Sequence, residues 1–178
     1  MFAEPGKFWS LRRRVFAEGS YFLFTIYSSN GGCLLKVLVL YYSRTGNTEK
    51  MAKAVAEGAK EAANVQVELN YFVEADDLGG FDAILVGTPT YHHDMPVDIK
   101  ALFEEAAARN VSLKGKPGAT FGSFGWSGEA PKLVLEIMKN KFEMKLPEAP
   151  LLAKYAPDQG MLDQCRALGR RVAESLIR

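Results

Sequence analysis

The residues best suited to chemistry are six consecutive, mostly short polar positions. They are Ser43, Arg44, Thr45, Gly46, Asn47 and Thr48. An apolar run at residues 37–40 precedes them, and apolar residues at helical spacing follow them up to residue 63. The first N–H groups of a helix lack partners within the helix, and the helix dipole favours negative charge. We therefore predict a phosphate site at residues 43–48, the alternative being an ordinary capped strand-to-helix turn.

Two common nucleotide motifs are missing from this loop. No lysine follows its glycine as GxxxxGK[ST] requires, and GxGxxG is not present, so neither a magnesium nucleotide triphosphate nor a dinucleotide is indicated. Hydroxyls together with backbone amides suit a terminal monophosphate. The loop resembles the FMN phosphate loop of the flavodoxin family, which has the pattern S-x-T-G-N-T. The resemblance covers residues 35–178 and implies FMN as the cofactor.

A second polar segment, TPTYHHDMP over residues 88–96, follows the apolar run at 82–87. Ligands of open parallel sheets bind outside the carboxyl ends of the strands, so this segment and the phosphate loop would meet there. It resembles the flavodoxin loop that walls one face of the flavin. The resemblance implies ring contacts from Pro89, Thr90, Tyr91 and His92. For His92 and His93 we favour solvent-exposed side chains without a defined role over a defined one, and adjacent histidines rarely bind one metal ion.

A third segment combines glycines with aromatic residues after the strand that we predict at 117–123. Glycines that flank an aromatic residue let the backbone approach a ligand while the ring stacks on it. The segment resembles the third flavin loop of flavodoxins, and most of all that of the flavodoxin domain in flavodiiron proteins. The resemblance implies ring contacts from Ser123, Phe124, Gly125, Trp126 and Gly128. Tyr91 and Trp126 are the candidates that flank the flavin; a core position at a turn is the alternative for Trp126.

The order of apolar patterns predicts an α/β fold in which five strands alternate with helices. The predicted strands span residues 37–40, 65–71, 82–87, 117–123 and 150–155, and apolar helical faces fall within 47–63, 96–107, 133–138 and 161–177. This indicates a doubly wound parallel sheet in three layers. The flavodoxin-like order 2-1-3-4-5 follows from the resemblance. Residues 72–81 are too few for a crossover helix, so we expect a turn there.

Residues 1–34 do not continue this pattern, and we treat them as an N-terminal extension to a flavodoxin-like FMN-binding domain at 35–178. The extension is either an added edge element or partner surface built from its aromatic residues, or the result of a start set too early, with translation beginning at Leu35. A signal peptide is disfavoured because the apolar core at 21–27 is short.

Composition narrows the function further. The chain has 178 residues, 48% of them hydrophobic, and a net charge of +1, which fits one globular domain and gives no reason to expect nucleic acid. The sequence contains no apolar run long enough to span a membrane. Cys33 and Cys165 show neither disulfide nor metal spacing, so we expect a reducing cytoplasm, no metal site and a core position for Cys165.

Two functions stay open. The first is an FMN-binding electron carrier of the flavodoxin type, whose partners are redox proteins such as a reductase, a ferredoxin or an acceptor protein. The second is an FMN-dependent NAD(P)H:quinone oxidoreductase, which the near-neutral charge favours because carriers tend to be strongly acidic. The missing insertions and the GWSG loop favour the carrier. No residue is predicted to be catalytic because the flavin carries the electron chemistry. A homo-oligomer also stays open.

Overall fold

The computed structural model describes residues 34–147 and 149–177. Within this part of the chain, strands and helices alternate. The strands are β1 (Leu35–Tyr41), β2 (Val65–Asn70), β3 (Ala83–Gly87), β4 (Gly118–Phe124) and β5 (Leu151–Lys154). The helices are α1 (Asn47–Ala59), α2 (Val97–Ala108), α3 (Glu129–Asn140), α4 (Gln159–Glu174) and the short 3₁₀ helix η1 (Ala75–Gly80).

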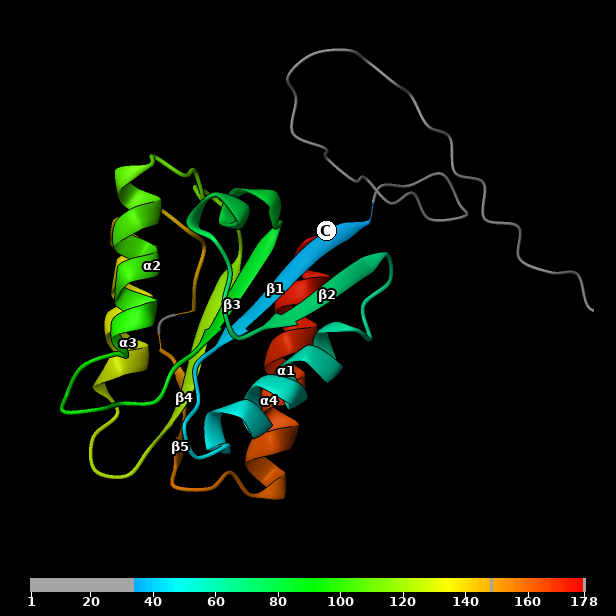
Figure 1. Ribbon diagram of the computed structural model, residues 1–178. Helices are drawn as coiled ribbons and strands as arrows, with labels where there is room; N and C mark the ends of the chain where they lie inside the picture. The colour runs from blue at the N-terminus through cyan, green and yellow to red at the C-terminus, as the bar shows by residue number, and fades with distance from the viewer. Residues whose placement is uncertain (1–33, 148, 178) are drawn as a thin grey trace, which may run out of the picture.

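The five strands form one parallel sheet in the order β2-β1-β3-β4-β5 (Figure 1). Helices α1 and α4 cover one face of this sheet, and α2 and α3 cover the other. The predicted fold class, its three layers and its strand order are therefore confirmed. The switch in winding direction lies between β1 and β3, where parallel α/β sheets bind ligands.

Strand β1 lies at the centre of the core because both of its faces are apolar. Val37 and Val39 pack against α1 and α4, whereas Leu38 and Leu40 pack in the cluster beneath α2 and α3. All four side chains are at most 1% exposed. The unbroken apolar run of β1 is thus what a parallel strand covered on both faces requires.

The connection from β2 to β3 is short, as the sequence predicted. Its only regular element is η1, a single 3₁₀ helix that takes the place of a crossover helix. The Lys116 ammonium donates hydrogen bonds to the carbonyl oxygens of Gly79 and Phe81, both at 2.7 Å. Burial lowers the pKa of Lys116, and the two carbonyls compensate in part for the water that its ammonium loses.

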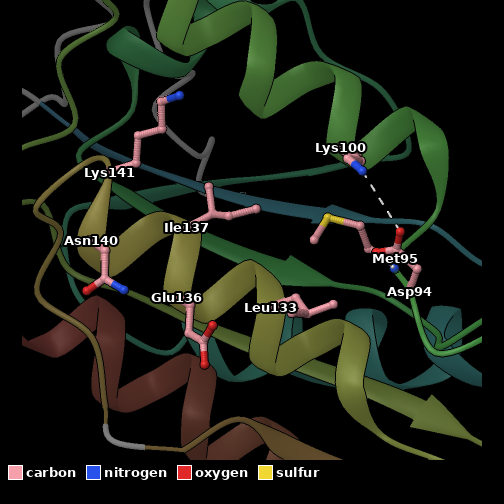
Figure 2. A pocket seen from close by; sticks show the side chains of 8 residues that line it. All are labelled: Asp94, Met95, Lys100, Leu133, Glu136, Ile137, Asn140 and Lys141. Carbon is pink, nitrogen blue, oxygen red and sulfur yellow. Dashed lines mark hydrogen bonds and ion pairs between the residues drawn. The ribbon is translucent and has the colours of Figure 1, made fainter.

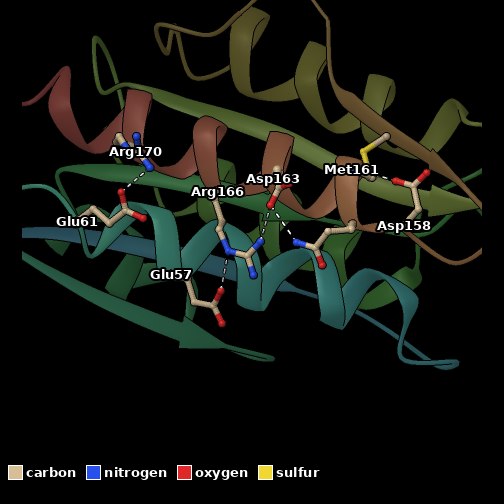
Figure 3. A network of polar contacts seen from close by, with 8 residues as sticks. Glu57, Glu61, Asp158, Met161, Asp163, Arg166 and Arg170 are labelled. Atoms are coloured by element: carbon tan, nitrogen blue, oxygen red, sulfur yellow. Dashed lines mark hydrogen bonds and ion pairs between the residues drawn. The ribbon is translucent and has the colours of Figure 1, made fainter.

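Helices α1 and α4 pack unusually closely, with glycines at their contact. A Cβ on Gly58 would overlap the carbonyl oxygen of Arg166, and a Cβ on Gly169 would overlap that of Val55. Around this contact, Figure 3 shows polar side chains that link the two helices. Arg166 Nε donates to Glu57 Oε2 at 3.0 Å, so ion pairs border the glycine contact.

Three further sequence predictions concern Cys165, the ends of the helices and the extension at residues 1–34. Cys165 is fully buried, as predicted for a core residue, and burial raises the pKa of its thiol to about 11. The predicted helices were too long at their ends, because α1 ends at Ala59 and α4 ends at Glu174. The extension at 1–34 lies outside the described residues apart from Leu34, and its interpretation stays a prediction. No helix of the described residues has the length and apolar character to cross a membrane.

Candidate functional site

The three loops predicted to bind the cofactor lie at one edge of the sheet. Residues 43–46 follow β1, residues 88–96 follow β3, and residues 125–128 follow β4. All three strands are parallel, so their carboxyl ends meet at the lower end of the sheet in Figure 1. Every predicted site residue is on one of these loops or on the strand end or first helical turn next to it.

The loop after β1 leaves the start of α1 open to an anion. Gly46 is the N-cap residue at φ 81°, and no side chain caps the helix. The Gly46 N–H donates instead to Ser43 Oγ at 3.1 Å, which closes the loop on itself. The acidic residue of the first turn, Glu49, pairs with Lys53 at 2.7 Å. The N–H groups of the first turn of α1 have no side-chain cap, and together with the hydroxyls of the loop they fit a phosphate.

Contacts join the three loops in pairs. Thr48 Oγ1 lies 2.9 Å from Ser123 Oγ, and both side chains are buried, so the start of α1 is tied to the end of β4. The Arg44 guanidinium lies over the Tyr91 ring at 5.9 Å from its centroid. Thr90 Oγ1 accepts a hydrogen bond from the Ala130 N–H at 3.2 Å. The loops therefore form one connected structure.

The Thr48–Ser123 contact predicts a non-additive effect on stability. We expect Thr48→Val or Ser123→Ala alone to lower the free energy of unfolding by about 1–3 kcal/mol, because each leaves a buried hydroxyl without a partner. The double variant should lie closer to the wild type than the sum of the two single changes. Urea denaturation of the four proteins gives the coupling, and additive losses would contradict the contact.

The segment 91–94 forms a tight turn. The N–H of Tyr91 donates to the Asp94 carbonyl at 3.0 Å, and the N–H of Asp94 donates to the Tyr91 carbonyl at 2.9 Å. His92 and His93 both have positive φ, 50° and 65°. Their side chains are exposed, as the sequence predicted. His93, however, has a partner that the sequence did not indicate, because its Nδ1 lies 3.0 Å from Glu129 Oε1.

The two aromatic candidates differ in exposure. Trp126 is 90% exposed, so the alternative of a core tryptophan is wrong; glycines on either side of the loop carry its ring out of the core. Tyr91 is half-buried and packs edge-on against Tyr42, with ring centroids 6.3 Å apart. Partial burial raises the pKa of the Tyr91 phenol above its ordinary value. These rings offer the planar surfaces that a flavin needs.

One groove lies beside these loops rather than in them. A hollow of about 430 Å³ lies between α2 and α3. Figure 2 shows the side chains that line it, with Asp94 and Met95 at one end. None of the predicted cofactor residues lines it. Within the described residues, no group of three or more histidine, cysteine, aspartate or glutamate side chains is arranged to hold a metal ion.

Comparison with known proteins identifies the family. The family model of flavodoxin matches residues 39–169. This chain belongs to the flavodoxin family. It is 38% identical over 148 residues to the type A flavoprotein fprA of Rhodobacter capsulatus, a match that covers 79% of this chain and 33% of the relative. It is 33% identical to the anaerobic nitric oxide reductase flavorubredoxin of Escherichia coli, covering 78% of this chain and 29% of the relative.

The solved structures agree with this assignment. A flavodoxin from the domain Archaea superimposes with a TM-score of 0.74 at 35% identity, covering 81% of this chain and 100% of the other. The rubredoxin:oxygen oxidoreductase of Desulfovibrio gigas superimposes with a TM-score of 0.69 at 26% identity, covering 80% and 36%. The chain spans about a third of the length of the curated relatives it matches.

Family membership confirms several of the sequence predictions. The flavodoxin resemblance, including the likeness to flavodiiron proteins, is confirmed by both kinds of comparison. FMN as the cofactor is confirmed with it, whereas the activity stays a proposal because the chain spans only about a third of its curated relatives. The free N–H groups at the start of α1 and the exposed indole of Trp126 fit that cofactor. The roles of individual residues stay predictions.

Proposed function

We propose that this chain is an FMN-dependent electron carrier that accepts electrons from one redox protein and delivers them to another. The observation that carries the proposal is the set of pairwise contacts among the three loops, which tie the open start of α1 to the end of β4 and the phosphate loop to Tyr91.

The residues of the first loop would hold the phosphate. Ser43, Thr45, Asn47 and Thr48 offer hydroxyls and an amide, and Gly46 leaves the backbone N–H groups of the helix start accessible, since a Cβ there would meet nothing within 4 Å. Arg44 forms no ion pair with a carboxylate among the described residues, so its charge is available to a phosphate.

The second and third loops would hold the ring. The backbone of 89–92 and 123–128 would line its edges, with Tyr91 and Trp126 against its faces. FMN supplies the one- and two-electron chemistry when bound, and the chain orients it and excludes water from part of the ring. Because Trp126 is on the surface, a partner protein could approach the cofactor at this edge. The expected partners are a reductase, a ferredoxin or an acceptor protein.

The second candidate is an FMN-dependent NAD(P)H:quinone oxidoreductase. The net charge of +1 favours it, because electrostatic steering of carriers normally requires a strong net charge. We rank it below the carrier because the missing insertions and the GWSG loop at residues 125–128 favour the carrier. A reducing cytoplasm remains the expected compartment, because Cys33 and Cys165 show no disulfide spacing.

Anaerobic reduction separates the two functions. The FMN-loaded protein is mixed with NADH and then with NADPH while the visible absorption of the flavin is followed. For a carrier, we expect no rapid bleaching by either nucleotide but ready reduction through a separate flavoprotein or ferredoxin reductase. Rapid bleaching by a nucleotide, followed by reoxidation with a quinone, would overturn the carrier in favour of the oxidoreductase.

A further inference from the structure

The 91–94 turn adopts a conformation that its residues do not favour by themselves. His92 and His93 both lie in the left-handed region, where a side chain with a Cβ is disfavoured. Tight turns with two positive φ angles normally use asparagine, aspartate or glycine at these positions. Strained residues of this kind persist only where the surrounding structure holds them. Contacts outside the turn must therefore stabilise it.

Side-chain contacts tie this part of the chain to the first turn of α3 at two points. At the first, His93 Nδ1 lies 3.0 Å from Glu129 Oε1, and Ser127 Oγ lies 3.4 Å from the same nitrogen. At the second, Thr90 Oγ1 accepts a hydrogen bond from the Ala130 N–H, and Tyr91 lies between Thr90 and His93 in the sequence.

The other end of the turn is fixed by packing between α2 and α3 and by an ion pair with α2. The Met95 side chain is 7% exposed and packs in the core cluster beneath α2 and α3. In Figure 2 Asp94 points toward Lys100 of α2, with 4.0 Å between the carboxylate and the ammonium. The turn is thus anchored at its end by Met95, while its tip depends on the contact of His93 with α3.

Glu129 is suited to hold that contact. Hydrogen bonds from Ser127 and His93 lower its pKa, so its carboxylate is charged at neutral pH. Its Oε2 atom is buried and has no hydrogen-bond partner among the described residues. Loss of the His93 contact would leave this carboxylate still less satisfied. The His93 and Glu129 side chains are 68% and 42% exposed, so the pair is a surface contact of modest strength.

We propose that His93 and Glu129 form a latch that holds the 91–94 turn on α3 and thereby positions Tyr91 against the ring of FMN. The inference rests on the proposed function, because it assumes that FMN binds at the three loops. His93 and Glu129 act as positioning residues in this proposal, and neither has to touch the cofactor. The latch joins two ring-binding loops that are separate in the sequence.

The latch is an ion pair only when the imidazole is protonated, but its hydrogen bond does not need that charge. A neutral imidazole that carries its proton on Nδ1 can also donate to the Glu129 carboxylate. The lowered pKa of Glu129 keeps this carboxylate charged at neutral pH, so it stays an acceptor.

The first test compares FMN affinity in three variants and the wild type. Apoprotein of wild type, His93→Gln, Glu129→Gln and the matched control Glu136→Gln is titrated with FMN by fluorescence quenching at neutral pH. Glu136 belongs to the same helix as Glu129, but its side chain is exposed and has no partner among the described residues. We expect about threefold weaker binding for His93→Gln and Glu129→Gln, the scale of an exposed polar contact, and no change for Glu136→Gln.

The double variant separates a latch from two unrelated contributions. Because a latch needs both partners, we expect His93→Gln/Glu129→Gln to bind FMN no more weakly than either single variant. Equal affinities of His93→Gln and Glu136→Gln would overturn the latch.

The second test observes the contact without FMN. The chain contains two histidines, so its imidazole proton resonances are few, and the variants His92→Gln and His93→Gln assign them. We expect Glu129→Gln to shift the His93 resonances and to leave those of His92 in place. Unchanged His93 resonances would refute the contact. If the wild type fails to bind FMN, the proposed function fails, whereas a wild type that binds FMN with no effect of His93→Gln refutes the latch alone.

Discussion

Replacing Gly169 with alanine is expected to lower the free energy of unfolding by about 3 kcal/mol. The added Cβ would overlap the carbonyl oxygen of Val55 and lie 2.9 Å from the Ala59 nitrogen. These are backbone atoms, which cannot rotate away as a side chain does, so α1 and α4 would have to separate. In an open helix the same change would stabilise by about 1 kcal/mol, so the contact reverses the usual sign.

Gly160→Ala is the matched control because Gly160 belongs to the same helix. A Cβ there would lie 3.6 Å from Asp158 Oδ1, an ordinary contact. We expect a change in stability of no more than about 1 kcal/mol, in the stabilising direction. Urea denaturation of both variants measures the difference. Equal stabilities of Gly169→Ala and Gly160→Ala would contradict the close packing of α1 on α4.

The fold was largely predictable from local patterns. Residues 37–40 carry apolar side chains at every position, which only a strand buried on both faces requires, and they form part of β1, an interior strand of the sheet. The short interval at 72–81 limited the connection to a turn, and η1 fills it. The close approach of Gly58 and Gly169 to the facing helix was not predictable. A glycine inside a helical pattern does not reveal which distant backbone lies against it.

The candidate site was predictable to the same degree, loop by loop. Each loop follows a strand and carries its own pattern of glycine, hydroxyl or aromatic residues, so its place at the sheet edge followed from the order of the elements. The contacts between loops were missed. Thr48 meets Ser123, and His93 meets Glu129, across intervals of sequence in which no local pattern links the partners. In the sequence, the only sign was a histidine pair in a turn lacking glycine.

The exposed indole of Trp126 gives the sharpest test of the ring site. Trp126→Ala is expected to weaken FMN binding about tenfold or more, because the flavin would lose a stacking surface. The unfolding free energy of the apoprotein should change by at most about 0.5 kcal/mol, since the side chain is 90% exposed and packs against little. Fluorescence titration with FMN and urea denaturation of the apoprotein measure the two quantities.

Phe72→Ala supplies the control for this experiment. Phe72 is also an exposed aromatic residue, 66% accessible, but it follows β2 and lies outside the three loops. A general contribution of surface aromatics would weaken FMN binding in both variants. A loss confined to Trp126→Ala, with both apoproteins as stable as the wild type, would place the flavin ring against this indole. Unchanged affinity in Trp126→Ala would instead remove Trp126 from the site and leave Tyr91 as the remaining flanking ring.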